Sequence, residues 1–404
     1  MPLSKITAAS ISDNSVTTAK VADDAITGAK IENNPTIAGN LTVSGGFIPS
    51  ESTSNRNMII NGNMAIHQRA ATNSHNDNAV DRYVLVKNNL DTADFTTKHQ
   101  VITDNPPFSD ALEIKCTTED TSIAANELIR IRMRLEANTL QKLQYGSSSA
   151  KSSTLSFWVK SNLTDTFSVA LTTQDGTSQN IGNTFTIAQA NTWQKVVWNI
   201  PGNTSGTINN DNGNGMMLVW GLTVGSGFRG TANTTWGTNS DARNLTGHTA
   251  NIASSTSNNF YLTGVQWELG DVATPFEHET FGDNLQKCQR YFAKSNSIGT
   301  APGENSEIGY TYASVSLSGT DVRVPFVTYP VRMRAAATVQ FDEPAYPLTG
   351  GSAGQWHYGG VEQYDTPSAS IQKDNGFYCS ATVAGASTNN AHWTSGEWTA
   401  DADL

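Results

Sequence analysis

Apolar residues recur every five positions at the start of the chain. They alternate with stretches of Ala, Thr, Asp and Lys, and the members of this ladder are Ile6, Ile11, Val16, Val21, Ile26 and Ile31. One aliphatic side chain in five buries too little area to offset backbone ordering, which costs roughly 1–2 kcal/mol per residue. We therefore predict that this segment orders only against copies of itself around a symmetry axis, with the ladder next to that axis.

The spacing of the ladder also constrains its conformation. Segments 11–20 and 21–30 repeat each other at their Asp, Thr and Lys positions. A period of five fits neither a strand nor a helix. We expect an extended path interrupted by turns, and a coiled coil would contradict this expectation.

From residue 57 onward the pattern changes to short alternating runs. Leu155, Phe157 and Val159 share one face of such a run, and Asn61-Gly62 between two apolar runs is typical of a turn. The pattern predicts strands at 81–86, 111–116, 127–135, 154–160, 167–172, 180–187, 193–200, 216–224, 260–269, 310–317, 321–327 and 331–341. Many short strands separated by turn residues favour a mainly β protein built around a β-sandwich.

Changes in texture divide the chain into five parts. A stripe at helical spacing, formed by Leu285, Cys288, Tyr291 and Phe292, predicts one short helix. Pro35, Gly45-Gly46 and Pro49 punctuate the end of the repeat region. The parts are a repeat stem at 1–46, a linker at 47–56, a β-sandwich body at 57–281, a short helix connector at 282–294 and a C-terminal β domain at 295–404.

Composition excludes several classes of function. Of 404 residues, 37% are hydrophobic and only 15% charged, and the net charge is −11, which argues against a nucleic-acid partner. Three scattered cysteines (Cys116, Cys288 and Cys379) predict buried free thiols. With neither a signal-peptide pattern nor a long apolar run, we expect no membrane insertion and synthesis in a cytoplasm, with release by another route such as lysis.

Candidate catalytic and metal-binding residues are sparse. Glu268 and Glu277, nine residues apart, could serve as the acid and base of a glycosidase. Alternation places Glu268 on the polar face of a strand and Glu277 after a Thr-Pro turn, so we favour structural roles and expect no enzyme activity. The seven histidines lack ligand spacing, so we expect no cofactor and no metal site. A structural Ca²⁺ in an Asn- and Asp-rich loop is conceivable, but the sequence does not place it.

Aromatic residues give a stronger indication of function, because their rings can stack on sugar rings. Tryptophans on the alternating strands are expected to pack in the core or between domains: Trp158, Trp193, Trp198, Trp220 and Trp267. Others lie in polar or Gly-rich regions, where we predict carbohydrate contacts with packing as the alternative: Phe228, Arg229, Trp236, Trp356, Tyr358 and Trp393. The alternating Arg332, Met333 and Arg334 indicate a half-solvated strand edge or a subunit contact.

Several blocks resemble a known family. The segment NMIINGNMAIHQR at 57–69, followed by Asp81-Arg82-Tyr83, resembles a segment that recurs in tail-fibre proteins of tailed bacteriophages. So do GVQWELG at 264–270, ATPFE at 273–277 and CQRYF at 288–292. LSFWVKS at 155–161 and TWQK at 192–195 resemble a jelly-roll body like that of carbohydrate-binding modules, and the stem resembles the repeats near the N-termini of many phage fibres. Trp267 and Tyr83 replace the family's usual Leu and Trp, and roughly the last 60 residues match nothing recognisable.

This resemblance implies a homotrimeric virion fibre. Residues 1–46 would attach to the phage tail or another particle protein, and the C-terminal side would face the host and bind its surface glycans. One alternative is a structural head or collar fibre without strong receptor binding. Another is a polysaccharide depolymerase, which would need a long repetitive β-helix and an acidic cleft that this sequence does not indicate.

Overall fold

The computed structural model describes residues 54–404 except 70–71, 75–77, 105–106, 231–233, 303–309, 342–351, 353, 360–362 and 389–390. By internal contacts the chain divides into two units, Met1–Ser50 and Glu51–Leu404. The predicted stem at 1–46, with its ladder from Ile6 to Ile31, lies outside the described residues. Its association about an axis therefore stays a prediction.

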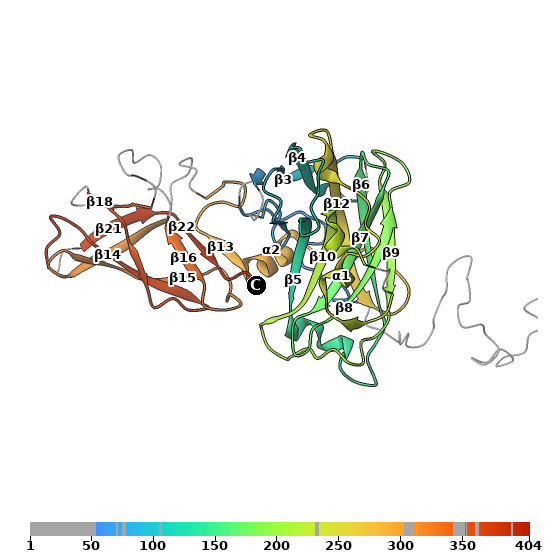
Figure 1. Cartoon of the computed structure of the whole chain (residues 1–404). Helices are drawn as coiled ribbons and strands as arrows, with labels where there is room; N and C mark the ends of the chain where they lie inside the picture. The colour runs from blue at the N-terminus through green and yellow to red at the C-terminus, as the bar shows by residue number, and fades with distance from the viewer. Residues whose placement is uncertain are drawn as a thin grey trace, which may run out of the picture. The chain divides into compact units, whose positions relative to one another are not determined.

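Two antiparallel six-stranded sheets form the first β domain, which Figure 1 draws in blue to yellow. The strand order is β1-β3-β4-β12-β6-β9 in the first sheet and β11-β8-β7-β10-β5-β2 in the second. The strands are β1 (Thr72–Ser74), β2 (Val84–Asn88), β3 (Asp94–Val101), β4 (Asp110–Thr118), β5 (Leu128–Glu136), β6 (Ser153–Ser161), β7 (Thr166–Thr173), β8 (Gln179–Thr186), β9 (Gln194–Ile200), β10 (Asn214–Val224), β11 (Gly237–Thr238) and β12 (Asn259–Leu269). Short 3-10 segments cover Ala137–Leu143, Ser226–Phe228 and Ile252–Ser254.

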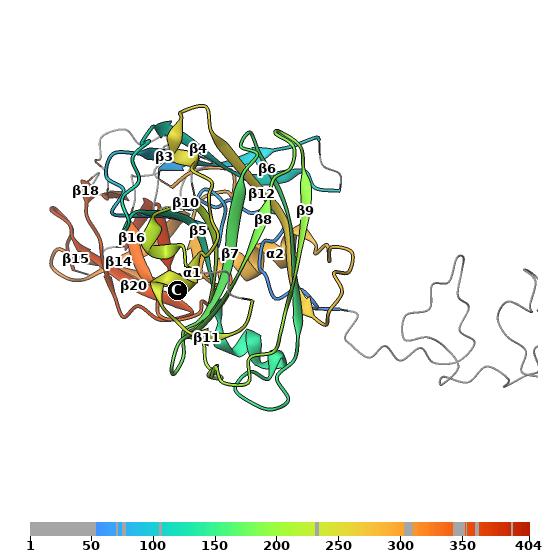
Figure 2. The ribbon, with the colours of Figure 1, turned by 45° about the vertical axis from the view of Figure 1, so that its right-hand side comes forward.

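The eight central strands have the connectivity of a jelly roll. Strands β4, β12, β6 and β9 are neighbours in one sheet, and β5, β10, β7 and β8 are neighbours in the other. The first of the eight therefore lies beside the last, and the second beside the seventh, as two Greek keys require. This order confirms the predicted β-sandwich. The short helix α1 (Asp241–Asn244) packs on the second sheet against β8, and both views show it on that sheet (Figures 1 and 2).

Strict alternation fills the space between the two sheets. On β5, Ile129, Ile131 and Met133 point into the core, whereas the residues between them point outward. The core also holds three of the predicted core tryptophans, because Trp198, Trp220 and Trp267 are all buried. Burying one large apolar side chain contributes about 1.5–3 kcal/mol, so this core is the main source of stability in the domain.

The segment 57–69 binds the edge of this core through a turn. Asn61 adopts a left-handed φ of 57°, and its side chain both donates to the Ile66 carbonyl at 2.9 Å and accepts from the Ile66 N–H at 3.0 Å. A Cβ on Gly62 would lie 2.1 Å from the Val265 carbonyl oxygen, so this position requires glycine. The predicted turn is confirmed, although the runs that flank it are not strands.

The predicted connector helix is present but shorter than expected. Helix α2 (Phe281–Gln289) begins after Thr280, whose hydroxyl accepts from the Asp283 N–H, and it ends at Gln289. Residues Phe292–Lys294 form strand β13 instead of a last helical turn. The helical stripe was misleading here because β13 pairs with a strand about a hundred residues later, a partner that local periodicity does not show.

Residues after α2 form a second β domain with two sheets, drawn in orange to red in Figure 1. The order is β13-β22-β16 in the smaller sheet and β18-β17-β21-β14-β15-β20-β19 in the larger one. The strands after β13 are β14 (Tyr310–Ser318), β15 (Asp321–Thr328), β16 (Thr338–Phe341), β17 (Trp356–Gly359), β18 (Gln363–Asp365), β19 (Ser368–Ser370), β20 (Gly376–Thr382), β21 (Ala391–Gly396) and β22 (Trp398–Asp401).

One predicted strand is much shorter in the structure. The run 331–341 yields only β16, and residues 332–334 are not a strand. Met333 is buried in the core of the C-terminal domain, and Arg334 donates to the carbonyl oxygens of Ala402 at 2.8 Å and Asn212 at 3.0 Å. The alternation of these residues thus reflects one core contact and main-chain contacts, so the strand-edge interpretation was wrong.

Two further expectations concern cysteines and membranes. Cys116, Cys288 and Cys379 are free and buried, as predicted. Among the described residues, no helix is long and apolar enough to span a bilayer.

Candidate functional site

Three of the predicted carbohydrate-contacting residues, Phe228, Arg229 and Trp236, lie between β10 and α1, and they do not form one surface. The indole of Trp236 packs edge-on against Tyr145, and its N–H donates to the Pro201 carbonyl at 2.7 Å. Phe228 instead packs beside Leu128 and Leu245 on the outer side of the second sheet. Arg229 is exposed and donates to the His248 carbonyl at 3.4 Å. Trp236 therefore has different neighbours from Phe228 and Arg229, and it packs against the core of the sandwich.

The other predicted residues, Trp356, Tyr358 and Trp393, form a second group in the C-terminal domain, and two of them lie in its core. Trp356 and Tyr358 on β17 are both 0% exposed. The Trp356 ring meets Phe341 edge-on, and its N–H donates to the Glu397 carbonyl at 2.8 Å. A sugar ring has no access to either side chain in this structure, so we assign them to packing.

Trp393, the third residue of that group, is exposed and held flat. It lies on β21 with 41% of its surface exposed. A Cβ on Gly359 would lie 1.8 Å from the Trp393 ring, so the indole rests directly on the β17 backbone. The His357 ring lies beside it, with ring centroids 4.8 Å apart. Because one ring face is seated on the sheet, the other face is turned to solvent.

A second exposed ring lies on the same face of the larger sheet. Phe377 and Cys379 on β20 point into the core, so Tyr378 between them points outward, with 44% of its surface exposed. Its ring packs against the Phe326 ring, with the two ring centroids 4.9 Å apart. Sequence reasoning did not select Tyr378, although the alternation around it would have placed it on the solvent side of a strand.

Tyr364 lies beside His357, with ring centroids 4.9 Å apart. The exposed rings of Trp393 and Tyr378, with the neighbouring rings of His357, Tyr364 and Phe326, form what we call the aromatic face. Position 313 on β14 is in register with Trp393, and β15 separates β14 from β20. Three strand spacings therefore divide Trp393 from Tyr378, or about 14 Å. The aromatic face can thus offer two stacking surfaces in one row across the sheet.

The outer face of the first sheet carries a different aromatic cluster. The ammonium of Lys160 lies 4.9 Å from the Trp193 ring and 4.8 Å from the Tyr261 ring. Its charge is paired with Asp104 at 2.7 Å, and the Trp193 N–H donates to the same carboxylate at 2.9 Å. The hydrogen bond from Lys160 lowers the pKa of Asp104. Since these groups satisfy one another, this cluster has fewer free contacts to offer a ligand than the aromatic face.

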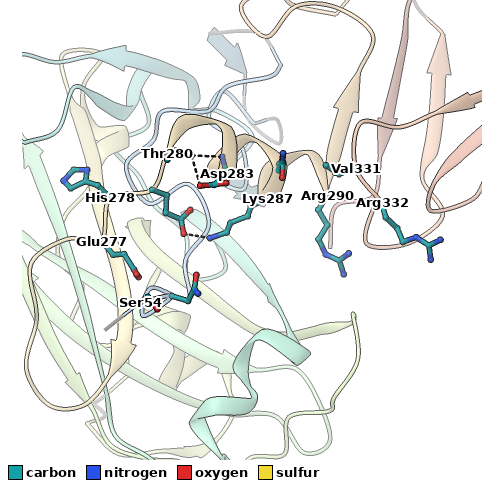
Figure 3. Close-up of a pocket in the computed structure, with 12 residues that line it drawn as sticks. Ser54, Glu277, His278, Thr280, Asp283, Lys287, Arg290, Val331 and Arg332 are labelled. Atoms are coloured by element: carbon teal, nitrogen blue, oxygen red, sulfur yellow. Dashed lines mark hydrogen bonds and ion pairs between the residues drawn. The ribbon is translucent and has the colours of Figure 1, made fainter. Parts of the chain in front are cut away.

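A polar pocket of about 650 Å³ lies beside α2 (Figure 3). Its lining includes Glu277, Glu279, Asp283, Lys287 and Arg290. Lys287 forms an ion pair with Glu279, and Thr280 donates to the Asp283 carboxylate at 2.7 Å. Arg290 binds Glu136 at 2.7 Å. The charged side chains of the lining are thus largely engaged with protein groups, and we assign no ligand to the pocket.

The two carboxylates considered as a catalytic pair hold a loop in place. Glu268 is 2% exposed and accepts from the Thr274 N–H at 2.9 Å and the Thr274 hydroxyl at 2.6 Å. Glu277 accepts from the Asn57 N–H at 2.8 Å, and its own N–H donates to Gln266 at 2.7 Å. These bonds fasten the loop after β12 and the segment at 57, which gives both carboxylates a structural role.

The described parts of the chain contain no group of three or more His, Cys, Asp or Glu side chains placed to hold a metal ion. A Ca²⁺ held mainly by carbonyl oxygens stays a prediction without a position.

Comparison with known proteins finds fold likeness only. No protein-family model matches the chain, and no curated protein is similar to it. Among solved structures, the enzymatically active domain of tailspike protein 4 from bacteriophage CBA120 is 11% identical, with a TM-score of 0.29 over 53% of this chain and 21% of that chain. A putative sugar binding protein from Bacteroides thetaiotaomicron is also 11% identical, with a TM-score of 0.30 over 53% of this chain and 100% of that one.

A family 11 carbohydrate-binding module from Clostridium thermocellum, in complex with a mixed-linked tetrasaccharide, is 12% identical. Its TM-score is 0.25 over 50% of this chain and 98% of that one. At such scores these likenesses carry no argument about what this chain binds, so the proposals below depend on its own residues.

Proposed function

We propose that this protein is a phage tail fibre that attaches the virion to glycans on the host surface. The repeat ladder at 1–46 and the fibre-like blocks at 57–69 and 264–292 support the fibre part of this proposal. The aromatic face on the C-terminal domain supports the glycan part. The fibre is a homotrimer whose stem binds a particle protein.

The observation that carries the glycan part is the seating of Trp393 on Gly359. An exposed indole is costly to leave in water, and it is more often buried, as Trp356 is. Here glycine removes the side chain that would otherwise tilt the ring, so a flat apolar surface faces solvent. Such a surface suits the C–H face of a sugar, and Tyr378 supplies a second one about 14 Å away in the same row.

Weak glycan sites give strong attachment when many copies bind at once. Three aromatic faces on a trimer, and several fibres on a particle, would raise avidity without any single tight site. We therefore expect low affinity for the isolated protein and strong attachment when it is multivalent.

The test is binding of the full chain to an array of bacterial surface glycans. Trp393→Ala should weaken binding at least tenfold, which corresponds to about 1.4 kcal/mol. Gly359→Ala should do the same with the indole still present, because the new Cβ displaces the ring. Trp193→Ala is the matched control, since it removes a partly buried surface tryptophan from the other domain.

Each outcome discriminates between hypotheses. Loss of binding in Trp193→Ala but not in Trp393→Ala would move the site to the jelly roll. No glycan binding by any form favours the structural-fibre alternative. We expect no hydrolysis, and release of reducing ends from host polysaccharide would instead indicate a depolymerase. A stable monomer in sedimentation would contradict the trimer.

A further inference from the structure

Strand β5 carries arginine at three alternate positions. Because Ile129, Ile131 and Met133 point into the core, Arg130, Arg132 and Arg134 lie together on the outer face of the second sheet. Successive side chains along one face of a strand are about 6–7 Å apart. We call these three residues the arginine row.

The arginine row is poorly satisfied by the protein itself. Each of the three side chains is half-buried, and each Nε atom is buried without a hydrogen-bond partner among the described residues. Burial lowers the pKa of Arg130, and burial together with the charges of Arg134 and Arg130 lowers the pKa of Arg132 to about 10. The fold therefore holds three like charges together at a cost that packing alone does not explain.

One end of the row is already occupied. Arg134 donates to the main-chain oxygen of Leu404, and the adjacent Arg82 forms an ion pair with Asp403. Arg130 and Arg132, at the other end, form no ion pair within the described part of the chain. Asp241, at the start of α1, acts on Arg130 only through space.

The register neighbours of Arg130 and Arg132 are valines and a glycine, which offer no polar side chain. Val86 and Val84 on β2 are in register with Arg130 and Arg132. On the other side, Gly221 and Val219 of β10 hold the same register positions. The nearest polar groups beyond Gly221 are the Ser168 hydroxyl and the His248 imidazole, and these two are hydrogen-bonded to each other at 3.0 Å.

We propose that Arg130 and Arg132 bind an acidic polysaccharide whose carboxylate or phosphate groups repeat along its chain. Guanidinium groups bind both anions through paired N–H donors, so the two chemistries share one mode of recognition. A linear polymer with regularly spaced charges matches a row along a strand better than a single small anion does. This site is separate from the aromatic face and does not depend on Trp393.

The negative net charge of the protein limits where a polyanion can bind. With a net charge of −11, the chain as a whole repels polyanions. Attraction of a polyanion therefore has to come from a local cationic feature. Binding that responds to two arginines and not to two other surface cations would identify the row.

The experiment is calorimetric titration of the full chain with polygalacturonate fragments, with poly(glycerol phosphate) and with neutral dextran. The test variant is R130Q/R132Q, and R130K/R132K keeps the charges without the paired donors. The matched control is K98Q/K115Q, which removes two exposed cations from β3 and β4 of the first sheet. Thermal unfolding of each variant checks that it folds, and R130Q/R132Q should not melt below the wild type.

We expect the wild type to bind at least one polyanion and not dextran. R130Q/R132Q should weaken that binding at least tenfold, R130K/R132K less, and K98Q/K115Q less than twofold. Salt should weaken the binding, and Trp393→Ala should leave it unchanged, which separates this site from the glycan site above. The proposal fails if neither polyanion binds, if both glutamine pairs lose affinity equally, or if R130Q/R132Q alters only the oligomeric mass.

Discussion

The two β domains treat their aromatic residues differently. In the jelly roll, Trp220 and Trp267 are fully buried between the sheets, and Trp193 on the outer face is tied to Asp104. In the C-terminal domain, Trp356 is equally buried, but Trp393 and Tyr378 keep 41% and 44% of their surface exposed. The difference between the domains is thus one of exposed aromatic rings on a sheet face, because aliphatic residues such as Val101 and Val272 are exposed in the first domain as well.

The cause of this difference lies in the residue under each ring. A strand presents alternate residues to opposite faces in both domains, so alternation alone does not distinguish them. What distinguishes Trp393 is Gly359 on the next strand, which lets the indole lie flat and outward. Substitutions in the two domains test this difference, because they should change stability by different amounts.

The largest effect is expected where an aromatic side chain fills the jelly-roll core. Trp267→Ala removes a fully buried indole whose N–H donates to the Ser153 hydroxyl at 3.0 Å, and should lower the free energy of unfolding by about 3–5 kcal/mol. Trp393→Ala should change it by less than about 0.5 kcal/mol. Urea unfolding followed by far-UV circular dichroism measures both, and similar losses in the two variants would contradict the comparison.

A smaller loss is expected where the two domains are joined. Glu136 at the end of β5 is 2% exposed and accepts two hydrogen bonds of 2.7 Å from Arg290 and one of 2.6 Å from the Tyr291 hydroxyl. Burial alone would raise its pKa, but these donors outweigh burial and lower it. Glu136→Ala should cost about 2–3 kcal/mol, less than a fully buried pair because Arg290 is partly exposed.

Hydrogen exchange checks this prediction by region. Protection should fall in both β5 and β13, since the substitution uncouples them. Lys287→Gln is the control, because it breaks only the more exposed pair with Glu279. Loss of protection confined to β5 would mean that Glu136 does not link the domains.

Much of the fold could be predicted from alternation. The runs at 154–160, 216–224 and 260–269 became β6, β10 and β12 with shifts of a few residues at most, because a half-buried strand records its two faces locally. Strand β3 (Asp94–Val101) was missed. Its sequence is rich in polar residues, and its place in the first sheet comes from pairing with β4.

The candidate site was less predictable, because exposure of an aromatic residue is decided by distant neighbours. Trp356, Tyr358 and Trp393 occupy similar Gly-rich sequence, yet two are core residues and one is a surface residue. The deciding contact of Trp393 is with Gly359, more than thirty positions earlier. The arginine row is the opposite case: its period of two is visible in the sequence, but the sequence does not show that Arg130 and Arg132 have no ion-pair partner among the described residues.

One pH-dependent effect is expected in the jelly roll. His248 is 1% exposed, with its Nδ1 3.0 Å from the Ser168 hydroxyl and its Nε2 2.8 Å from the Ala250 carbonyl, and burial lowers its pKa to about 4. In the unfolded chain the His248 imidazole becomes protonated near pH 6.5, whereas in the folded chain it stays neutral at that pH. The stabilisation is therefore fully present above the unfolded pKa and is lost as the pH falls toward 4, by about 2 kcal/mol between pH 7 and pH 5.

Urea unfolding at pH 7, 6 and 5 measures this loss. His248→Gln should remove that part of the pH dependence, because glutamine carries no titrating group. An unchanged slope in the variant would assign the acid sensitivity to other residues.

The smallest effect is expected in the C-terminal domain, in the turn between β19 and β20. Ile371 has a left-handed φ of 51° although it is β-branched, and 63% of its surface is exposed. This conformation costs a β-branched residue roughly 1–2 kcal/mol, whereas asparagine tolerates it. Ile371→Asn should therefore raise the free energy of unfolding by about 1 kcal/mol. Val272→Asn, at a 70% exposed position of the other domain, should leave it nearly unchanged, and equal gains would show that lost apolar exposure, not backbone strain, is responsible.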